Sequence, residues 1–509
     1  MEKTKKPFTA KALEAIEIVG NKLPSPIAIF MILTVAVILI SGLLANAGTS
    51  VLHPGTGEYV YATNLMSVTS LQEWVTNALL NFRNFPPLHL GLAVMIGAGL
   101  ASHTKFFETV LKMSVSNVSP KLISLVVIIA GVLGSTASDA FTIALPPLAA
   151  LLFIGAGRHP LPGIFAAFAS VSATLSANPV VNSLDILLQS FTNPAAQLIN
   201  PDIYLSPAMN YIFMAVSSVI LVGVIYFVTE KIVAPRFDGQ AYEKDSTDDM
   251  DALTQVTDQE RRAVKFSLLG VAVFAIILVL LSTIPTSNGY PFLLGEGIDS
   301  ILAGQSIFMR ALVLIVTIFF FIPGFIFGVM TGQIKSSHDL FKLLSKGMSE
   351  MGPFIVIAFF ASQFISLFAQ SNLAVILAVN GANFIQSIGL TGPLLFIAFI
   401  LLTAMINMVM LSASAQWAIF APIFIPMFYV MGYSPELTTA IYRIGDSATN
   451  IISPLHSYLP LIIVYVSKYK KNVGFGTLFA NLLPYTLAIG VVWFAILLVF
   501  YFFRLPLGF

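Results

Sequence analysis

The chain has 509 residues, of which 57% are hydrophobic and only 10% are charged, and its formal net charge is +1. A soluble protein carries about 25% charged residues, so most of this surface is expected to face lipid, and the near-neutral charge gives no indication of nucleic-acid binding. The chain contains no cysteine, which excludes disulfides, thiol catalysis and thiolate metal sites. The composition therefore predicts an all-α membrane protein.

Segments long enough to cross a bilayer recur along the chain, each with about 20 mostly apolar residues. Residues 1–25 precede the first of them, and they carry several lysines but lack the apolar core and cleavage site of a signal peptide. Nine spans are predicted, in chain order, at 26–47, 88–111, 122–133, 209–228, 264–283, 308–331, 352–368, 390–410 and 475–503.

Lysine and arginine predict the orientation of these spans, because the cytoplasmic connections of membrane proteins are enriched in both. The connections 48–73 and 285–304 contain neither residue, whereas the N-terminal segment and the connection 231–263 contain several. We therefore expect a cytoplasmic N-terminus, a first membrane half over 26–230, an acidic cytoplasmic linker over 231–263 and a second half over 264–509. The last span then leaves the C-terminus in the periplasm.

Two apolar regions, 134–188 and 411–466, are interrupted by Pro, Gly, Ser and Asn too often to form one continuous span each. Non-helical backbone is tolerated at membrane depth only where protein or water satisfies its N–H and C=O groups. Each half is therefore predicted to contain a re-entrant helical hairpin followed by an unwound helix. The hairpins are expected over 134–153 and 411–431, and the unwound segments over 176–182 and 449–457.

An internal repeat relates the two interrupted regions. Ser172-Ala173-Thr174 and Ser447-Ala448-Thr449 lie 275 positions apart, and the prolines that follow them, Pro179 and Pro454, keep the same separation. Paired interrupted helices at corresponding positions of two halves indicate the substrate site of a secondary transporter. The charge pattern favours an odd number of crossings between the copies, which predicts two inverted repeats.

Arg443, Asp446 and Asn450 follow at spacings of three and four residues, so a helix would place them on one face. A charged residue at the centre of a membrane helix costs about 2.5–3.5 kcal/mol on insertion scales. In one interpretation, Arg443 and Asp446 neutralise each other inside the bundle. In the other, Arg443 binds an anionic group of a substrate through its planar guanidinium, and Asp446 holds a proton or a cation. The adjacent repeat favours the second interpretation.

In the first half, Asn178, Asn182, Asp185 and Gln189 share one helix face. Asp185 has no basic residue within one helical turn, and a lone carboxyl at membrane depth either stays protonated or binds a cation. Asp185 is therefore a candidate for carrying the coupling ion, with a satisfied core carboxyl as the alternative.

Trp417 lies three residues after Ser414, one turn along the second predicted hairpin. A tryptophan in a membrane protein usually anchors the interface with water. Beside a polar hairpin tip, the indole is also placed to stack on an aromatic substrate, and both interpretations stay open.

The sequence gives no sign of an enzyme, a bound metal or a cofactor. The six histidines have no metal-ligand spacing, and no Walker A pattern, glycine-rich nucleotide loop or nucleophile elbow occurs. ATP-driven pumping by this chain is therefore not expected. A membrane-embedded enzyme is also disfavoured, because it would need an acid/base or metal cluster.

Several short segments carry a resemblance that covers nearly the whole chain. They are Gly-Asn-Lys-Leu-Pro at 20–24, Ser-Ala-Asn at 176–178 with Asp185, Val-Thr-Glu-Lys-Ile-Val at 228–233, Ser-Ala-Ser-Ala-Gln-Trp at 412–417, and Arg-Ile-Gly-Asp-Ser at 443–447 with Asn450 and Pro454. Together they resemble the p-aminobenzoyl-glutamate transporter (AbgT) family.

The resemblance implies nine transmembrane helices with two re-entrant hairpins, a homodimer, and the bacterial inner membrane as the location. It implies transport of p-aminobenzoyl-glutamate or efflux of sulfonamide antimetabolites, driven by an ion gradient. By motif match, it places six residues on the substrate path: Asp185, Ser414, Trp417, Arg443, Asp446 and Pro454.

The expected partners are thus a small-molecule substrate, a coupling ion and membrane lipid. The predicted site comprises Asn178, Asp185, Ser414, Trp417, Arg443, Asp446, Asn450 and Pro454, with Asp185 and Asp446 as the candidates for ion coupling. Carboxylates serve protons and sodium alike, but the scarcity of clustered acidic residues within the spans favours the proton. The alternative within transport is a sodium-coupled di- or tricarboxylate carrier of related hairpin architecture. Alternating access is reversible, so the sequence leaves the direction of transport open.

Overall fold

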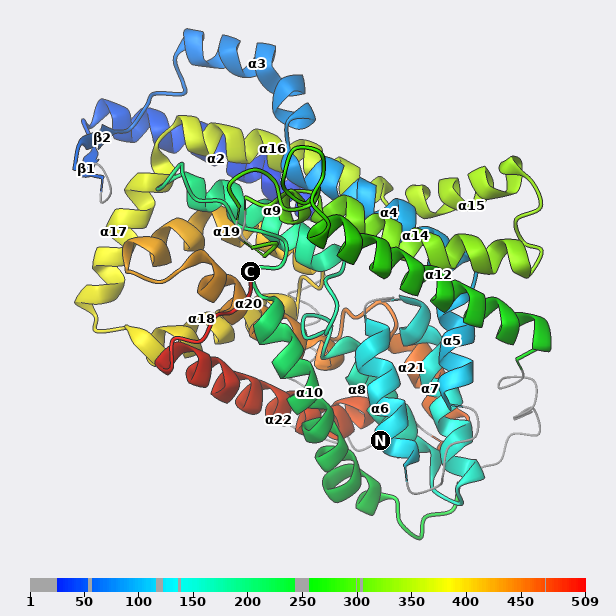
Figure 1. Cartoon of the computed structure of the whole chain (residues 1–509). Helices are drawn as coiled ribbons and strands as arrows, with labels where there is room; N and C mark the ends of the chain where they lie inside the picture. The colour runs from blue at the N-terminus through cyan, green and yellow to red at the C-terminus, as the bar shows by residue number, and fades with distance from the viewer. Residues whose placement is uncertain are drawn as a thin grey trace, which may run out of the picture.

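The structure is a computed structural model that describes residues 25–53, 57–115, 122–135, 139–242, 256–298, 300–302, 305–471 and 473–509 (Figure 1). Nearly all of the predicted N-terminal segment, and positions 243–255 of the predicted linker, lie outside the described residues. The rest is almost entirely helical. Its one described sheet is a short antiparallel pair, β1 (Ser50–Leu52) and β2 (Tyr59–Tyr61).

Two consecutive sets of helices lie on either side of positions 243–255. The first set is α2 (Pro26–Asn46), α3 (Val68–Arg83), α4 (Pro86–His103), α5 (Phe106–Val115), α6 (Ile123–Gly134), α7 (Asp139–Gly155), α8 (Pro160–Ser172), α9 (Ser183–Gln197) and α10 (Tyr211–Val228), which continues as η2 (Thr229–Val233) and η3 (Ala234–Arg236). The second set is α12 (Asp258–Thr283), α13 (Ile307–Arg310), α14 (Leu312–Met330), α15 (Ser337–Ser349), α16 (Gly352–Gln370), α17 (Leu373–Ser387), α18 (Gly392–Asn407), α19 (Ala413–Val430), α20 (Pro435–Ala448), η4 (Asn450–Ile452), α21 (Leu459–Ser467) and α22 (Phe475–Phe502).

Eight helices of the described chain are long and apolar enough to cross a membrane, or nine if the bent pair α17 and α18 forms one span. The prediction of an all-α membrane protein with about nine spans is therefore confirmed. The predicted span 88–111 is divided into α4 and α5 beside Lys105, whose φ of 61° is left-handed. In α12 only 11% of the apolar stretch is buried, as expected of a helix that faces lipid on most sides.

Glycines bring α4 and α14 into close contact. A Cβ on Gly97 would lie 2.0 Å from the carbonyl oxygen of Thr317, and a Cβ on Gly324 would lie 2.6 Å from the backbone nitrogen of Ala101. Without a hydrophobic force between helices in lipid, small residues favour association by letting backbones approach closely. These two positions therefore fix the α4–α14 packing, and a larger side chain at either would separate the helices.

The internal repeat appears in the order of the helices. α8 begins at Pro160 and α20 begins at Pro435, 275 positions later, and the pairs α6/α18, α7/α19, α9/α21 and α10/α22 follow the same order. Helical structure is interrupted at equivalent places, over 173–182 between α8 and α9 and over 449–458 between α20 and α21, where only η4 forms. The two predicted unwound segments are thus confirmed.

The structure differs from the predicted hairpin boundaries. The ranges 134–153 and 411–431 are each occupied mainly by one continuous helix, α7 and α19, and the described break of the second region, at 408–412, lies before α19. Prolines inside both segments suggested an internal turn, but both helices continue through their prolines. Pro147 frees the carbonyl of Ile143, four residues earlier, and the hydroxyl of Tyr465 donates to that carbonyl at 3.1 Å. We therefore expect the two arms of the first hairpin to be α6 and α7, and those of the second to be α18 and α19.

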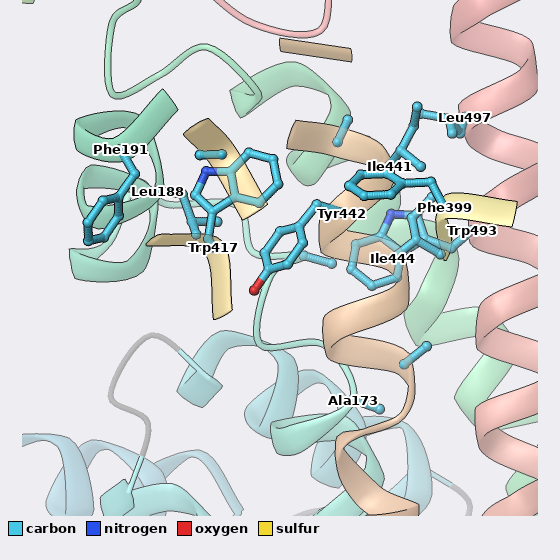
Figure 2. Close-up of a cluster of buried hydrophobic side chains, with 14 of the residues drawn as sticks. Ala173, Leu188, Phe191, Phe399, Trp417, Ile441, Tyr442, Ile444, Trp493 and Leu497 are labelled. Carbon is cyan, nitrogen blue, oxygen red and sulfur yellow. The ribbon is translucent and has the colours of Figure 1, made fainter. Parts of the chain in front are cut away.

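Apolar side chains enclose the broken helices. Figure 2 shows Trp417, Tyr442 and Trp493 among the buried side chains between α19, α20 and α22. All three have no exposed surface. The polar groups described next consequently lie in a part of the molecule from which solvent is excluded.

Candidate substrate site

Each unwound segment contacts the end of the helix that precedes the other one. The backbone N–H of Ser176 donates to Ser447 Oγ at 3.1 Å, and Asn450 Nδ2 donates to the backbone carbonyl of Ser172 at 3.1 Å. Ser172 and Ser447 are equivalent positions of the repeat, so each copy holds the other at the same point. Reciprocal contacts of this kind are typical of two units related by a two-fold axis. The inversion of the repeats relative to the membrane stays a prediction.

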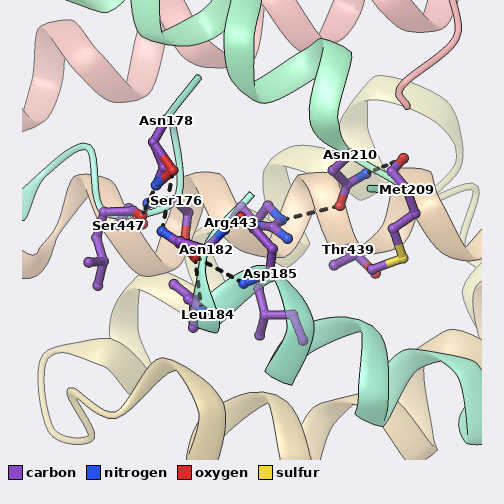
Figure 3. Close-up of polar contacts among 12 residues, drawn as sticks. Ser176, Asn178, Asn182, Leu184, Asp185, Met209, Asn210, Thr439, Arg443 and Ser447 are labelled. Carbon is purple, nitrogen blue, oxygen red and sulfur yellow. Dashed lines mark hydrogen bonds and ion pairs between the residues drawn. The ribbon is translucent and has the colours of Figure 1, made fainter. Parts of the chain in front are cut away.

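Asp185 lies at the start of α9 and faces Arg443 of α20 (Figure 3). Asn182 caps α9 by accepting from the N–H groups of Leu184 and Asp185, and Asp185 Oδ2 accepts from the N–H of Asn182 at 2.8 Å. Asp185 Oδ1 accepts from Arg443 Nη1 at 2.7 Å, and both side chains are 1% exposed. No basic residue lies within one turn of Asp185, as the sequence indicates, but Arg443, 258 positions away, supplies a partner. This contact agrees with the alternative of a satisfied core carboxyl, and the role of Asp185 in carrying the coupling ion stays a prediction.

The guanidinium of Arg443 is held from two sides. Its Nη1 donates to Asp185, and its Nε donates to Asn210 Oδ1 at 3.2 Å. The third nitrogen, Nη2, is buried and has no hydrogen-bond partner among the described residues. Burying an unsatisfied donor of a charged group is unfavourable, so Nη2 marks a place where an acceptor from outside the chain would be stabilised.

Asp446 does not pair with Arg443, although the two lie on one face of α20. No ion pair between them is found in the described structure, where the carboxylate accepts from Tyr442 and Ser447 hydroxyls at 3.4 Å each. The first interpretation of the sequence, in which the two side chains neutralise each other, therefore does not hold, because the guanidinium is directed toward Asp185. Asp446 is fully buried with two long hydroxyl contacts, which leaves its oxygens able to accept a further ligand.

Asn407, at the end of α18, is a site residue that the sequence reasoning missed. Its Nδ2 donates to the carbonyl of Asp446 (2.5 Å), to Thr449 Oγ1 (3.0 Å) and to Asn450 Oδ1 (2.8 Å). Its Oδ1 is buried without a partner in the described structure. Asn407 thus ties the break between α18 and α19 to the unwound segment. A buried amide at the end of an apolar run was the signal that could have identified it.

Trp417 is neither a membrane-interface anchor nor exposed at a hairpin tip. Its Nε1 donates to Thr192 Oγ1 of α9 at 2.9 Å. The centroids of the Trp417 and Tyr442 rings are 4.3 Å apart, and the ring planes are inclined at 35° (Figure 2). The hydroxyl of Tyr442 in turn donates to the carbonyl of Ala413 at 2.7 Å. The two rings therefore form a fixed aromatic wall beside the segment that carries Arg443.

The remaining predicted residues differ in how deeply they lie. Asn178 is buried and donates from Nδ2 to the carbonyl of Leu175 at 2.8 Å, and Asn450 is buried between the two breaks. Ser414, in the first turn of α19, and Pro454, after η4, are half-buried. Most of the predicted set thus lies on the two breaks and α20, with Ser414 and Pro454 at its more accessible edge.

Within the described residues, no group of three or more His, Asp or Glu side chains is arranged to hold a metal ion. The polar groups of the site are amides, hydroxyls, one arginine and two carboxylates. This chemistry suits an oxygen-rich organic molecule and a small monovalent cation or proton.

Broken helices from two repeats that meet around a buried charge pair are typical of a secondary transporter. Residues 11–509 match the model of the AbgT putative transporter family. The chain is also 33% identical over 496 residues to the p-aminobenzoyl-glutamate transport protein of Escherichia coli (strain K12), with 97% of this chain and 95% of that protein covered. The chain therefore belongs to the AbgT family, whose members and relatives are transporters and not enzymes.

Two solved structures resemble the fold closely. The YdaH transporter of Alcanivorax borkumensis, described as having an unusual topology, is 34% identical with a TM-score of 0.89, and the match covers 95% of this chain and 100% of that one. MtrF of Neisseria gonorrhoeae, described as illuminating a class of antimetabolite efflux pumps, is 35% identical with a TM-score of 0.88, covering 96% and 97%. The chain is thus a multi-span membrane transporter, consistent with the bacterial inner membrane.

Proposed function

We propose that this chain is a secondary active transporter of p-aminobenzoyl-glutamate-like aromatic carboxylates, an exporter of sulfonamide antimetabolites, or both. Transport is coupled to an ion gradient, with the proton as the favoured ion, by alternating access. The Escherichia coli relative is named for p-aminobenzoyl-glutamate and MtrF for antimetabolite efflux. Both kinds of compound combine an aromatic amine ring with a group of strongly accepting oxygens.

The observation that supports this proposal best is the open Nη2 of Arg443, buried between the halves. A carboxylate or sulfonyl oxygen accepts well from a guanidinium, which offers donors in a fixed plane. The aromatic wall of Trp417 and Tyr442 has no exposed surface in this structure, so it supplies apolar area for a ring only when the site opens during alternating access. A small aliphatic acid would use Arg443 but not the wall.

The ion pair of Asp185 and Arg443 provides a route to coupling. An anionic substrate that takes Arg443 leaves Asp185 without its counter-charge, and a buried carboxylate without compensation is strongly unfavourable. A proton on Asp185 removes that charge. Binding of the substrate anion therefore raises the affinity for the proton, and the proton raises the affinity for the anion by the same factor. A neutral sulfonamide leaves the pair intact, so its transport is expected to depend less on the proton.

Transport in reconstituted vesicles tests the proposal. Labelled p-aminobenzoyl-glutamate and labelled succinate are offered in parallel, with pH and sodium gradients imposed separately. We expect movement of the aromatic compound and a response to the pH gradient. Movement of succinate alone, driven by sodium, would instead identify the di- or tricarboxylate carrier, and the aromatic assignment would be wrong.

The arrangement in the membrane is also proposed: a homodimer with two halves, 26–230 and 264–509, joined by a cytoplasmic linker over 231–263, with a cytoplasmic N-terminus and a periplasmic C-terminus. Because the chain contains no cysteine, single cysteines report on sidedness without background. Tyr59→Cys, at an exposed position, should react with an impermeant thiol reagent from the periplasm. Phe341→Cys, also at an exposed position, should react only after the membrane is opened, and the reverse pattern would overturn the orientation.

A further inference from the structure

We infer that residues 505–509, named here the C-terminal strap, act with Asn210 to position the guanidinium of Arg443. This inference rests on the proposed role of Arg443 in substrate binding. The strap and Asn210 are then positioning residues: neither needs to touch the substrate, but both set where Nη2 points.

A turn at the end of α22 directs the strap back across the bundle. The N–H of Leu505 donates to the carbonyl of Phe500 at 2.9 Å, and the N–H of Arg504 donates to that of Tyr501 at 3.3 Å. These are the two bonds of a Schellman motif, whose left-handed residue is usually glycine. Here it is Arg504, with φ 51°. A residue with a side chain disfavours this conformation, so the contacts of the strap have to stabilise it.

The strap is hydrogen-bonded to residues 206–213, which lead into α10 and form its first turn. The carbonyl of Leu507 accepts from the N–H of Phe213 at 2.9 Å, the N–H of Phe509 donates to the carbonyl of Ala208 at 3.1 Å, and Ser206 Oγ donates to the carbonyl of Phe509 at 2.5 Å. The N–H groups in the first turn of a helix have no partner within that helix, and α10 has no side-chain cap. The strap therefore satisfies a donor at the start of α10.

Gly508 shows how closely the strap approaches. A Cβ at this position would lie 2.1 Å from the carbonyl oxygen of Ala208 and 2.4 Å from the carbonyl carbon of Met209. Both neighbours are backbone atoms, which cannot turn aside as a flexible side chain can. Any other residue at 508 consequently moves either the strap or the backbone of the residue that precedes Asn210.

Asn210 links this backbone to the substrate site (Figure 3). It occupies the N-cap position of α10, where asparagine usually accepts from the helix N–H groups, but its side chain does not cap the helix. Instead, its Oδ1 accepts from Arg443 Nε at 3.2 Å, and its Nδ2 donates to the carbonyl of Glu436 at 2.9 Å. Asn210 is fully buried, so these two bonds fix its amide plane.

The position of the strap suggests that it acts through Asn210 and not through α20 directly. A cavity of about 380 Å³, lined by the strap together with Met209, Ser434 and Glu436, lies where the strap faces the start of α20. The hydrogen bonds of residues 507–509 go to positions 206–213. Displacing the strap should therefore move the backbone of Asn210 first, and Arg443 as a consequence.

Transport kinetics of three full-length variants test this inference. Asn210→Ala removes one hydrogen bond to a charged group, which should raise the KM for p-aminobenzoyl-glutamate about 10-fold or more, with a smaller change in kcat. Gly508→Ala should raise KM in the same direction. Gly490→Ala in α22 is the matched control, because a Cβ there meets no atom within 4 Å, and it should behave as the parent chain.

The double variant Asn210→Ala/Gly508→Ala separates positioning from a general loss of packing. If the strap acts through Asn210, the second substitution adds little to the first, whereas independent effects would add. Asn210→Asp provides a second test if Gly508→Ala fails to fold. It keeps the acceptor toward Arg443 but adds a negative charge, so it should weaken an anionic substrate more than a neutral sulfonamide.

The outcomes distinguish this inference from the proposed function. If Arg443→Lys raises KM but both Asn210→Ala and Gly508→Ala match Gly490→Ala, the strap inference is wrong and the proposed function stands. Additive effects in the double variant, or equal losses for anionic and neutral substrates in Asn210→Asp, would also overturn it. If Arg443→Lys leaves KM unchanged, the proposed function itself is wrong.

Discussion

Substitution of Asp185 by asparagine is the most direct test of the coupling mechanism. The side chain makes two strong contacts, at 2.8 Å from the N–H of Asn182 and at 2.7 Å from Arg443 Nη1. Asparagine retains an acceptor for one of them but has no charge. The variant should therefore keep the start of α9 intact while leaving Arg443 buried without its counter-charge.

The expected cost follows from the burial of the pair. Removing one partner of a buried ion pair destabilises a protein by about 3–5 kcal/mol, which does not exceed the usual folding free energy of about 5–15 kcal/mol. Asp185→Asn should thus insert and fold, with a lower melting temperature. An anionic substrate would then supply the missing charge, so ligand should raise the melting temperature more in the variant than in the parent chain.

Vesicle transport provides the assay. In Asp185→Asn, exchange of p-aminobenzoyl-glutamate down its own gradient should persist, while acceleration by a pH gradient should disappear. Asp202→Asn, at an exposed position in the connection after α9, is the matched control and should respond to pH as the parent does. A pH-driven response of Asp185→Asn equal to that of the control would remove Asp185 from the coupling mechanism.

Substitutions at three further residues test the surrounding structure. Trp417→Phe should keep the contact with Tyr442 but lose the hydrogen bond to Thr192, which should cost about 1 kcal/mol of stability. Trp417→Ala should weaken the binding of aromatic substrates more than that of aliphatic ones. Equal losses of transport for both kinds of substrate would show that the indole serves only in packing. Asn407→Ala leaves three acceptors without their shared donor and should lower the free energy of unfolding by about 1–3 kcal/mol for each acceptor that water cannot reach. The melting temperature should fall accordingly, and an unchanged melting curve would contradict this account. Burial lowers the pKa of His159, in the turn before α8, and the charge of Lys470 lowers it further. The folded state therefore favours neutral histidine, and the free energy of unfolding should fall as pH drops below about 6.5. His159→Asn keeps a capping acceptor for the N–H of Leu161 and should flatten that pH dependence in thermal melts, and a variant with the parent's slope would exclude His159 as its source.

The sequence predicted the parts of the site that depend on local pattern. Repeated Ser-Ala-Thr segments with prolines at a constant separation located both helix breaks, because a break needs residues that tolerate non-helical backbone wherever it occurs. The hairpin boundaries were wrong for a related reason. A proline has to interrupt a helix only if its freed carbonyl stays unsatisfied, and the carbonyl of Ile143 has a partner in Tyr465, more than 300 positions later.

Contacts between the halves were beyond this kind of reasoning. Asp185 looked isolated because only residues within a turn were considered, yet its partner lies 258 positions away on the other copy of the repeat. Pairing of Arg443 with Asp446 stayed open as an alternative because the two share a helix face. Periodicity specifies which side of a helix a residue occupies, but the direction of a long side chain depends on what packs against it, and here Asp185 and Asn210 determine that direction.

The two copies of the repeat contribute different things to the site. Their hydrogen bonds across the centre are reciprocal, from Ser176 to Ser447 and from Asn450 to Ser172, so the repeat accounts for the meeting of the breaks. The charges are not repeated: 275 positions before Arg443 and Asp446 the chain has Phe168 and Val171. Under the proposed function, each chain therefore has one guanidinium to bind an anion and one carboxylate that loses its counter-charge on binding. If the ion pair couples transport to the gradient, one proton should accompany each substrate anion that Arg443 binds. This ratio of protons to substrate can be measured in vesicles. A ratio above one would require a second titrating group, for which Asp446 is the candidate.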